Sequence, residues 1–221
     1  MKLRSASLLL LLFVSTQLDA ADYRVEPLDE SAPADEISAD VAATLAPTGV
    51  RVVRGTKTTY CDIWLCKEWA AREDFKPTAA LLYPFTPGQL VGVVRFARKG
   101  SDFRDQDIES GVYTLRYGQQ PVDGSHVGTS LTRDFLLLLR AETDQSADTL
   151  DYSALAKRSA EAAGSSHPAL LSMQRVAEEP AESPAIRHDE EHDWWIVGLA
   201  GKTKGATGLR IEFVVYGIAA E

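Results

Sequence analysis

Short apolar runs recur along this chain, and turn-forming residues separate them. The run 111–117 alternates apolar and polar side chains, which is the two-residue period of a strand with one buried face. This pattern predicts about eight or nine short strands in the chain. The other strand-like runs are 50–54, 58–65, 79–83, 90–97, 135–139, 169–176, 194–200 and 209–218.

The order of these runs favours an antiparallel sheet. No regular strand–helix–strand rhythm appears, so a parallel sheet is not expected. We therefore expect a mainly β protein with an antiparallel β-sandwich or jelly-roll-like fold, and a partly closed barrel is the alternative. The run 135–139 is apolar at every position, which indicates a strand buried on both faces.

One main helix is expected at about residues 151–163. This segment is rich in Ala, Leu, Lys and Glu, which are good helix formers. Thr149 or Asp151 can serve as its N-cap, and Gly164 can adopt the left-handed conformation that ends a helix.

The N-terminus has the three-part layout of a secretory signal peptide in residues 1–20. Lys2 and Arg4 give a positive start, residues 8–14 are apolar, and Ala20 is a small residue before the expected cut. The apolar run is far shorter than the ~20 residues that span a bilayer. This predicts a secreted or periplasmic protein with no membrane span after signal cleavage, and a retained membrane anchor is the alternative.

The mature chain is expected to consist of a leader and one domain. Residues 21–47 are polar and acidic and contain Pro27 and Pro33, which predicts a flexible leader with a short helix capped by Ser38. Residues 48–221 are then a single β-sandwich domain.

The mature chain is strongly acidic. Loss of residues 1–20 removes two basic residues and one acidic residue, so the formal charge falls from −9 to −10. Because an acidic surface repels phosphate backbones, no nucleic-acid partner is expected.

Cys61 and Cys66 leave two possibilities open. Export permits a disulfide, but an extended strand would separate the two Cα atoms by ~16 Å, whereas bridged Cα atoms lie within roughly 7 Å of each other. Either the segment bends sharply and the bridge forms, or the segment is a strand and both thiols stay free.

The segment 188–193 holds the candidate metal ligands His188, Glu191 and His192. It matches the H-x-x-E-H pattern, which on a helix would present both histidines to Zn²⁺ with the glutamate as general base. The alternative is a solvated acidic loop, because prolines precede the segment and a strand-like run follows it. The carboxylates of the 102–109 loop are a second, calcium-type candidate, although their spacing does not fit the twelve-residue calcium loop.

Weaker ligand candidates lie in two turn-like segments. Asp123 and His126 occur in Q-P-V-D-G-S-H-V-G, and His167 occurs in G-S-S-H-P. Each segment also places a serine beside an imidazole, but catalytic triads assemble in space and no G-x-S-x-G elbow is present. No catalytic residue is therefore assigned.

Aromatic residues on the predicted strands are the remaining candidates. Trp64, Tyr113 and Tyr117 would contact a glycan or a protein if they stood exposed on one sheet face. The alternative is that they pack in the core, where such rings are common.

Several motifs together resemble a group of secreted bacterial proteins of unknown function. The resemblance covers most of residues 48–218, implies a β-sandwich, and carries no assigned activity or catalytic residues. The motifs are I-W-L (63–65), G-V-V-R-F (92–96), S-G-V-Y-T-L-R-Y-G-Q-Q-P-V-D-G (110–124), R-D-F-L-L-L (133–138), S-H-P-A-L-L-S (166–172) and H-D-E-E-H-D-W-W (188–195).

Taken together, the sequence favours an exported, non-catalytic β-sandwich that binds a protein, a glycan or an envelope component. The alternative is a metal-assisted hydrolase that uses the 188–193 segment, with Zn²⁺ or Ca²⁺ as the metal.

The signal-peptide prediction can be tested on protein exported from a bacterial host. We expect N-terminal sequencing to find a chain that starts at or near Ala21, because the peptidase cuts after the small residue at the end of the leader. A mature protein that keeps residues 1–20 and remains in the membrane fraction would contradict this prediction.

Overall fold

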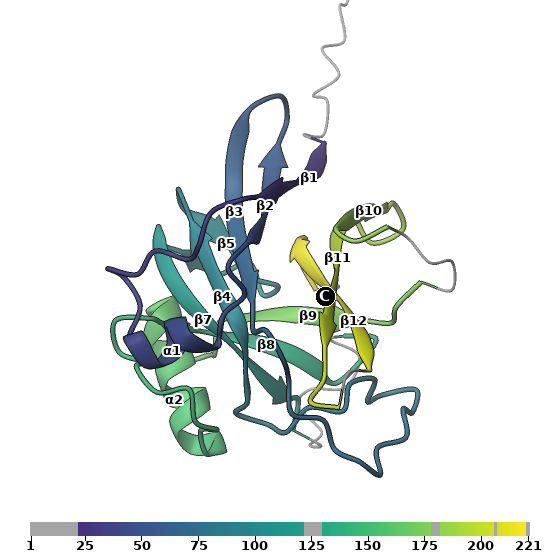
Figure 1. Ribbon diagram of the computed structural model, residues 1–221. Coiled ribbons are helices and arrows are strands. Elements are labelled where there is room, and N and C mark those ends of the chain that lie inside the picture. Colours follow the sequence, from purple (N-terminus) through teal and green to yellow (C-terminus); the bar gives the residue numbers. More distant parts are fainter. Residues whose placement is uncertain (1–21, 122–129, 178–181, 206, 220–221) are drawn as a thin grey trace, which may run out of the picture.

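The computed structural model describes residues 22–121, 130–177, 182–205 and 207–219. Residues 1–20, where the signal peptide is predicted, lie outside this part of the chain. The described residues are mainly β, with antiparallel sheets and one main helix (Figure 1). The predicted fold class is therefore confirmed.

Ten strands form one sheet, in which all neighbours are antiparallel. A separate two-stranded ribbon consists of β5 (Gly100–Ser101) and β6 (Asp107–Ile108), and the helices are α1 (Ala39–Thr44) and α2 (Tyr152–Ala163). The order of strands in the large sheet is β1 (Tyr23–Leu28), β2 (Gly49–Arg54), β3 (Thr58–Leu65), β4 (Leu90–Phe96), β7 (Gly111–Gln119), β8 (Asp134–Arg140), β9 (Leu170–Gln174), β12 (Gly208–Tyr216), β11 (Trp194–Lys202) and β10 (Ala185–Asp189).

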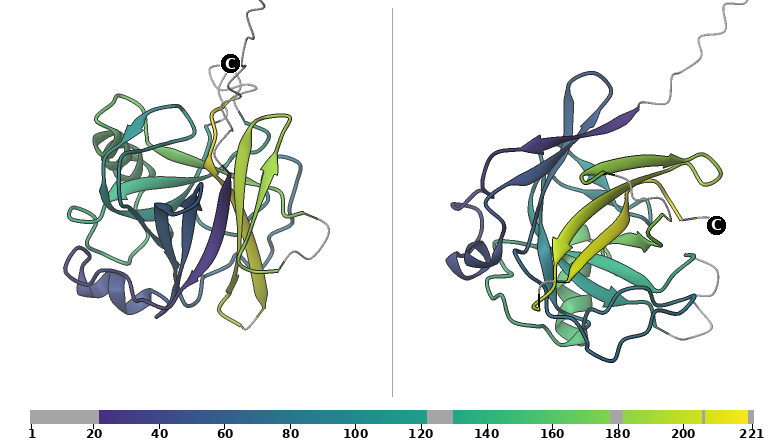
Figure 2. Two further views of the ribbon diagram at one scale, coloured as in Figure 1. Left: turned by 90° about the horizontal axis from the view of Figure 1, so that it is seen from above. Right: turned by 45° about the vertical axis from the view of Figure 1, so that its right-hand side comes forward.

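The large sheet curls until its two edge strands, β1 and β10, lie side by side (Figures 1 and 2). No backbone pairing joins these two strands among the described residues. Instead, the ring of Tyr23 packs on Trp195 at 5.3 Å and stacks on Tyr216 at 4.9 Å between centroids. Aromatic packing therefore closes the seam of a nearly closed sheet.

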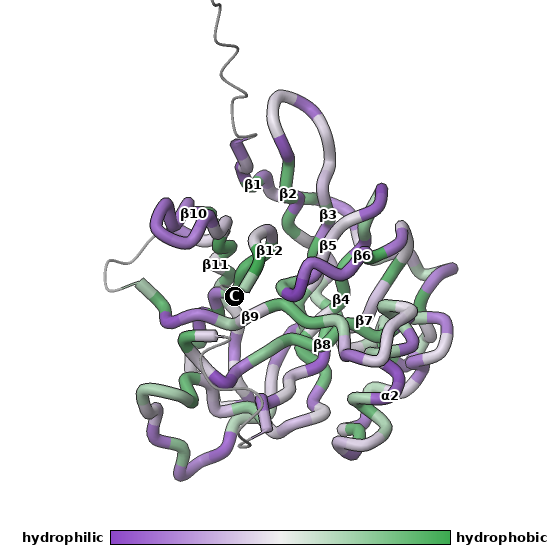
Figure 3. The backbone as a smooth tube through the Cα atoms, turned by 180° about the vertical axis from the view of Figure 1, so that it is seen from behind, coloured by the Kyte–Doolittle hydropathy of each residue, from purple (hydrophilic) through white to green (hydrophobic). Residues whose placement is uncertain are grey.

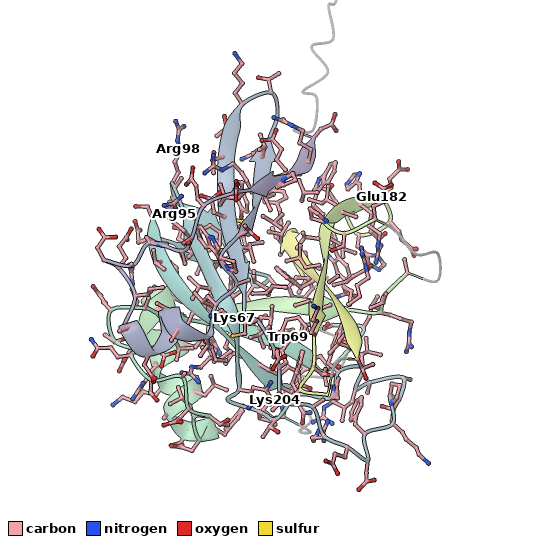
Figure 4. All side chains as sticks on the ribbon, in the orientation of Figure 1. Lys67, Trp69, Arg95, Arg98, Glu182 and Lys204 are labelled. Atoms are coloured by element: carbon pink, nitrogen blue, oxygen red, sulfur yellow. The ribbon has the colours of Figure 1, made fainter. Side chains whose placement is uncertain are left out.

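Hydrogen bonds of a buried tryptophan, Trp69, connect two parts of the sheet away from this seam. Trp69 is buried, its backbone N–H donates to Lys202 O at 2.8 Å, and its Nε1 donates to Val91 O at 2.9 Å. Lys204 N donates back to Trp69 O at 2.8 Å, and Figure 4 shows the two residues next to each other. The connection after β3 is thus fixed to the β11–β12 hairpin.

Hydrophobic side chains fill both faces of β8, because side chains alternate along a strand. Leu136 and Leu138 belong to the main core inside the curled sheet. Phe135, Leu137 and Leu139 belong to a second core on the outer face, which α2 and the loop before β6 cover. The predicted strand buried on both faces is confirmed, and Figure 3 shows β8 as a largely hydrophobic segment, in contrast to the hydrophilic β10 hairpin.

The N-caps predicted for both helices are confirmed. The Asp151 carboxylate accepts a hydrogen bond from Ala154 N at 3.0 Å, and Ser38 Oγ accepts one from Val41 N at 3.1 Å. Gly164 follows α2 with φ of 60°, as a left-handed helix end requires.

Two segments that the sequence indicates as leader and loop are strands. Residues 23–28 form β1 and residues 185–189 form β10, each pairing on one side only. Tyr23 and Leu28 are buried in the main core, so the domain includes most of the predicted flexible leader. Charged residues and prolines hid both strands, since an edge strand tolerates such residues where a central strand does not.

The prediction of a strand at 79–83 is wrong, because this segment is irregular in the structure. It is nevertheless held in place, since Leu82 N donates to the Asp134 carboxylate at 2.7 Å. Tyr83 is buried, and its hydroxyl donates to Gln174 O at 2.6 Å. Its apolar residues therefore indicate burial of an irregular segment rather than sheet pairing.

The pairing of β2 with β3 contains a β-bulge. Val52 lies opposite Cys61 and Val53 opposite Thr59, so Tyr60 is the extra residue of a β-bulge. The ring of Tyr60 packs on Phe96 at 5.8 Å. The Tyr60 side chain therefore belongs to the main core.

Both cysteines are free and buried. Cys61 lies within β3, and Cys66 follows the end of that strand, so the extended alternative holds. Burial raises the pKa of Cys66 to about 11 and also raises the pKa of Cys61. Both thiols are thus protonated and unreactive at neutral pH.

A fully buried ion pair supports the outer face of β7. Arg116 Nε donates to Asp144 at 2.5 Å, and both side chains are completely buried. The same guanidinium donates to the carbonyl oxygens of Gly88, Ser146 and Asp148 at 2.8, 2.5 and 2.7 Å. The pair thereby fixes the connection that leads from β8 to α2.

No helix among the described residues is long and apolar enough to cross a membrane.

The buried pair makes a prediction about stability. We expect Asp144→Ala to lower the free energy of unfolding by about 3–5 kcal/mol, because it leaves the Arg116 charge buried without its partner. Urea unfolding followed by circular dichroism measures this loss. The control is Glu26→Ala, which breaks the exposed Arg24–Glu26 pair and should cost at most about 1 kcal/mol. Equal losses for the two variants would contradict the prediction.

Candidate functional site

A cleft of about 620 Å³ lies on the outer side of the sheet, between α2, the loop before β6 and the C-terminal tail. Its floor is apolar, and the exposed side chains of Arg104, Asp105 and His167 lie at its mouth. The lining residues are Phe103, Arg104, Asp105, Gln119, Gln120, Pro121, Phe135, Leu137, Tyr152, Ala156, His167, Pro168, Leu170, Ile218 and Ala219.

The floor of the cleft is the uncovered part of the second core. Phe135 and Leu137 point outward from β8 and are buried, and Leu170 at the start of β9 packs against them. Ala156 lies one helical turn after Tyr152, so both occupy the side of α2 that faces this floor. The small alanine leaves space that a larger side chain would fill.

One wall is the loop 102–106, which folds around a buried carboxylate. Asp102 accepts hydrogen bonds from the backbone N–H groups of Arg104 and Gln106, both at 2.8 Å, and from Leu170 N at 3.0 Å. Burial raises the pKa of Asp102, although these hydrogen bonds oppose the shift. The loop is thus fixed to β9, and the side chains of Arg104 and Asp105 stay exposed at the mouth.

A second wall, beside this loop, is the tail after β12. Trp194 Nε1 donates to Ile218 O at 2.7 Å, and Ala219 N donates to Phe103 O at 2.8 Å. The rings of Phe103 and Trp194 pack edge to face with centroids 5.2 Å apart. The tail is therefore held against the loop while the Ile218 side chain remains exposed.

Exposed hydrophobic side chains concentrate at this cleft. The exposed large hydrophobic residues of the described chain are Leu131, Tyr152 and Ile218, with 62%, 50% and 49% of their surface accessible. Tyr152 and Ile218 both line the cleft, whereas Leu131 does not. An apolar concave surface of this kind typically marks a binding site.

Of the predicted ligand residues, His167 lies at the cleft. Its side chain is exposed, and its backbone N–H donates to Ser165 Oγ at 3.2 Å. Asp123 and His126 fall outside the described residues, so their placement stays a prediction.

The predicted aromatic candidates are completely buried and present no face to a ligand. Trp64 Nε1 donates to Glu30 O at 2.7 Å, because the segment before α1 covers this ring. Tyr113 and Tyr117 point into the main core, where burial raises the pKa of both phenols. The packing alternative accounts for all three residues.

The candidate metal ligands do not converge. His188 Nε2 lies 2.8 Å from Asp193 Oδ1, and its ring stacks on Trp195 at 4.4 Å. The ring of His192 stacks on Trp194 at 4.3 Å. Since consecutive residues of a strand point to opposite faces, these stacks hold the two imidazoles on opposite sides of the hairpin.

The remaining members of this cluster complete the same picture. His192 Nδ1 lies 3.1 Å from Asp189 Oδ2, and Glu191 is exposed in the turn. Within the part of the chain that is described, no group of three or more His, Cys, Asp or Glu side chains is placed to hold a metal ion. A strand and turn occupy the segment where the zinc pattern requires a helix.

Sequence reasoning did not find most of the cleft. Phe103, Tyr152 and Ile218 come from three distant segments, and the sequence shows each as an ordinary apolar residue. A usable signal was present at Tyr152, because a large aromatic residue at the first position of a helix has no earlier turn of that helix to pack on.

Comparison with protein-family models, with curated proteins and with solved structures gives no match for this chain.

The arrangement of the histidines makes a prediction about metals. We expect the melting temperature to be the same in Zn²⁺ and in EDTA, and the same for His188→Gln/His192→Gln in both, because the two imidazoles cannot share one ion. Differential scanning fluorimetry measures the four conditions. A zinc-dependent rise in melting temperature that the double variant abolishes would contradict this expectation.

Proposed function

We propose that this chain is an exported, non-catalytic binding protein whose ligand occupies the cleft beside α2. The ligand is a small apolar or amphipathic molecule of the cell envelope or its surroundings. Export rests on the layout of residues 1–20, and the binding role rests on the cleft.

The observation that carries this proposal is the concentration of exposed hydrophobic surface at one concave site. Tyr152 and Ile218 are about half exposed, and leaving such side chains in water is unfavourable. They belong to different walls, α2 and the tail, above a floor of core residues. A bound apolar group would contact both side chains and extend the second core outward.

The size and lining of the cleft also support a small ligand. Ligand sites commonly enclose 300–1,000 Å³ and combine an apolar lining with a few polar groups, and this cleft of about 620 Å³ has that composition. Two other hollows measure about 520 and 310 Å³. Neither is lined by an exposed large hydrophobic side chain.

The hydrolase alternative finds no comparable support. It requires His188 and His192 to act on one ion or one substrate, whereas they stack on different tryptophans. Among the residues that the structure describes, no carboxylate or hydroxyl pairs with the ring of His167 at the cleft, so the geometry favours binding over catalysis.

The binding role can be tested with an uncharged apolar fluorophore, phenylnaphthylamine, whose emission rises in an apolar site. We expect saturable binding to the wild-type protein and about tenfold weaker binding to Ile218→Asp, because that variant places a carboxylate against the bound apolar group.

Leu131→Asp is the matched control, since it adds the same charge at an exposed leucine outside the cleft. It should bind the fluorophore as the wild type does. Equal binding by the wild type and by both variants, or no binding by any of them, would refute the proposed site.

A further inference from the structure

An unpaired guanidinium stands at the mouth of the cleft. Among the described residues, Arg98 and Arg104 are the arginines whose side chains make no hydrogen bond, ion pair or ring contact. Arg98 lies at the upper left edge of the molecule in Figure 4 and does not line the cleft. Arg104 lines the cleft and is exposed.

The backbone that carries this arginine is fixed although its side chain is free. Arg104 N donates to the buried Asp102 carboxylate, which also binds Gln106 and Leu170. The guanidinium therefore extends from a rigid base beside the apolar floor. Its planar set of N–H donors suits a carboxylate, which can accept two parallel hydrogen bonds from it.

The adjacent Asp105 also lines the mouth and is exposed. This free carboxylate is a weaker indication of the charge of the ligand than Arg104 is, because a chain with net charge −9 has a large excess of carboxylates that cannot all be paired. In such a chain a free arginine beside an apolar cleft is the unusual feature. Removing the charge of Arg104 and removing the charge of Asp105 should change the affinity for a charged ligand in opposite directions, and both changes can be tested.

Resting on the proposed function, we propose that the ligand is a single-chain amphiphile with a carboxylate head, of the fatty-acid class. Its alkyl chain lies on Phe135, Leu137 and Leu170, and its head lies against Arg104. The exposed His167 stands at the same mouth as a further polar group.

The net negative charge of the protein does not prevent this recognition. At physiological ionic strength, charges farther away than about 8 Å are largely screened. A direct hydrogen-bonded contact with Arg104 is screened much less and therefore decides which head group is preferred.

The test compares three ligands with the same alkyl chain and different heads: decanoate, decanol and decyltrimethylammonium. Isothermal titration calorimetry gives each dissociation constant at physiological salt. We expect decanoate to bind roughly tenfold more tightly than decanol, as one charge-assisted pair would give. The ammonium compound should bind more weakly than the alcohol.

Two variants of exposed residues should change the affinity for decanoate in opposite directions. Arg104→Gln should weaken decanoate binding roughly tenfold and leave decanol unchanged. Asp105→Asn should strengthen decanoate binding about twofold to fivefold, because it removes a like charge from the mouth. Asparagine suits this position, where φ is 61°, since it tolerates left-handed backbone.

Arg98→Gln is the matched control, because it removes the other free arginine without touching the cleft. It should leave all three affinities unchanged, and unchanged melting temperatures of all variants confirm that each is folded. Equal affinities for decanoate and decanol, or tighter binding of the ammonium compound, would overturn the inference while leaving the binding role intact. If none of the three ligands binds while phenylnaphthylamine does, the inference fails and the binding role stands; if phenylnaphthylamine does not bind either, both fail.

Discussion

The buried pair of Arg116 and Asp144 is the constraint on which the outer half of this structure depends. A guanidinium in the sheet is stable there only when its donors are satisfied, and Asp144 with three backbone carbonyls provides that. The connection between β8 and α2 must therefore fold over the outer face of β7. Arg158 of α2 lies 3.5 Å from the same carboxylate, so the charge pair also limits where the helix can lie.

The position of α2 creates the cleft. The helix covers Leu139 and part of Leu137 with Leu155, but it leaves the Phe135 end of β8 beneath a gap. The loop around Asp102 and the tail held by Trp194 form the other walls without filling it. A strand with hydrophobic side chains on both faces needs packing partners on both sides, and the elements that pack on the outer face of β8 leave part of it uncovered. That incomplete cover is the physical basis of the proposed binding site.

The sequence predicts the parts of this structure that local chemistry determines. The caps of α2 at Asp151 and Gly164 and the doubly buried run of β8 depend on residues close together in the chain, and they are confirmed. The edge strands β1 and β10 were not predicted, for different reasons. β1 contains Pro27 and pairs with β2 across the segment that holds α1, whereas β10 forms a local hairpin with β11 but follows Pro184 and carries charged residues. Among the residues that line the cleft, the sequence indicated His167 as a candidate. The walls of the cleft could not be predicted, because they form by packing of segments that are far apart in the chain.

The most direct test of the proposed binding mode is a crystal structure of the protein with decanoate bound. The proposed binding mode has the alkyl chain against Phe135 and Leu137 beneath Tyr152, with the carboxylate within hydrogen-bonding distance of the Arg104 guanidinium. An alkyl chain bound at another site, such as the seam between β1 and β10, or a cleft filled by protein side chains in the crystal, would contradict it.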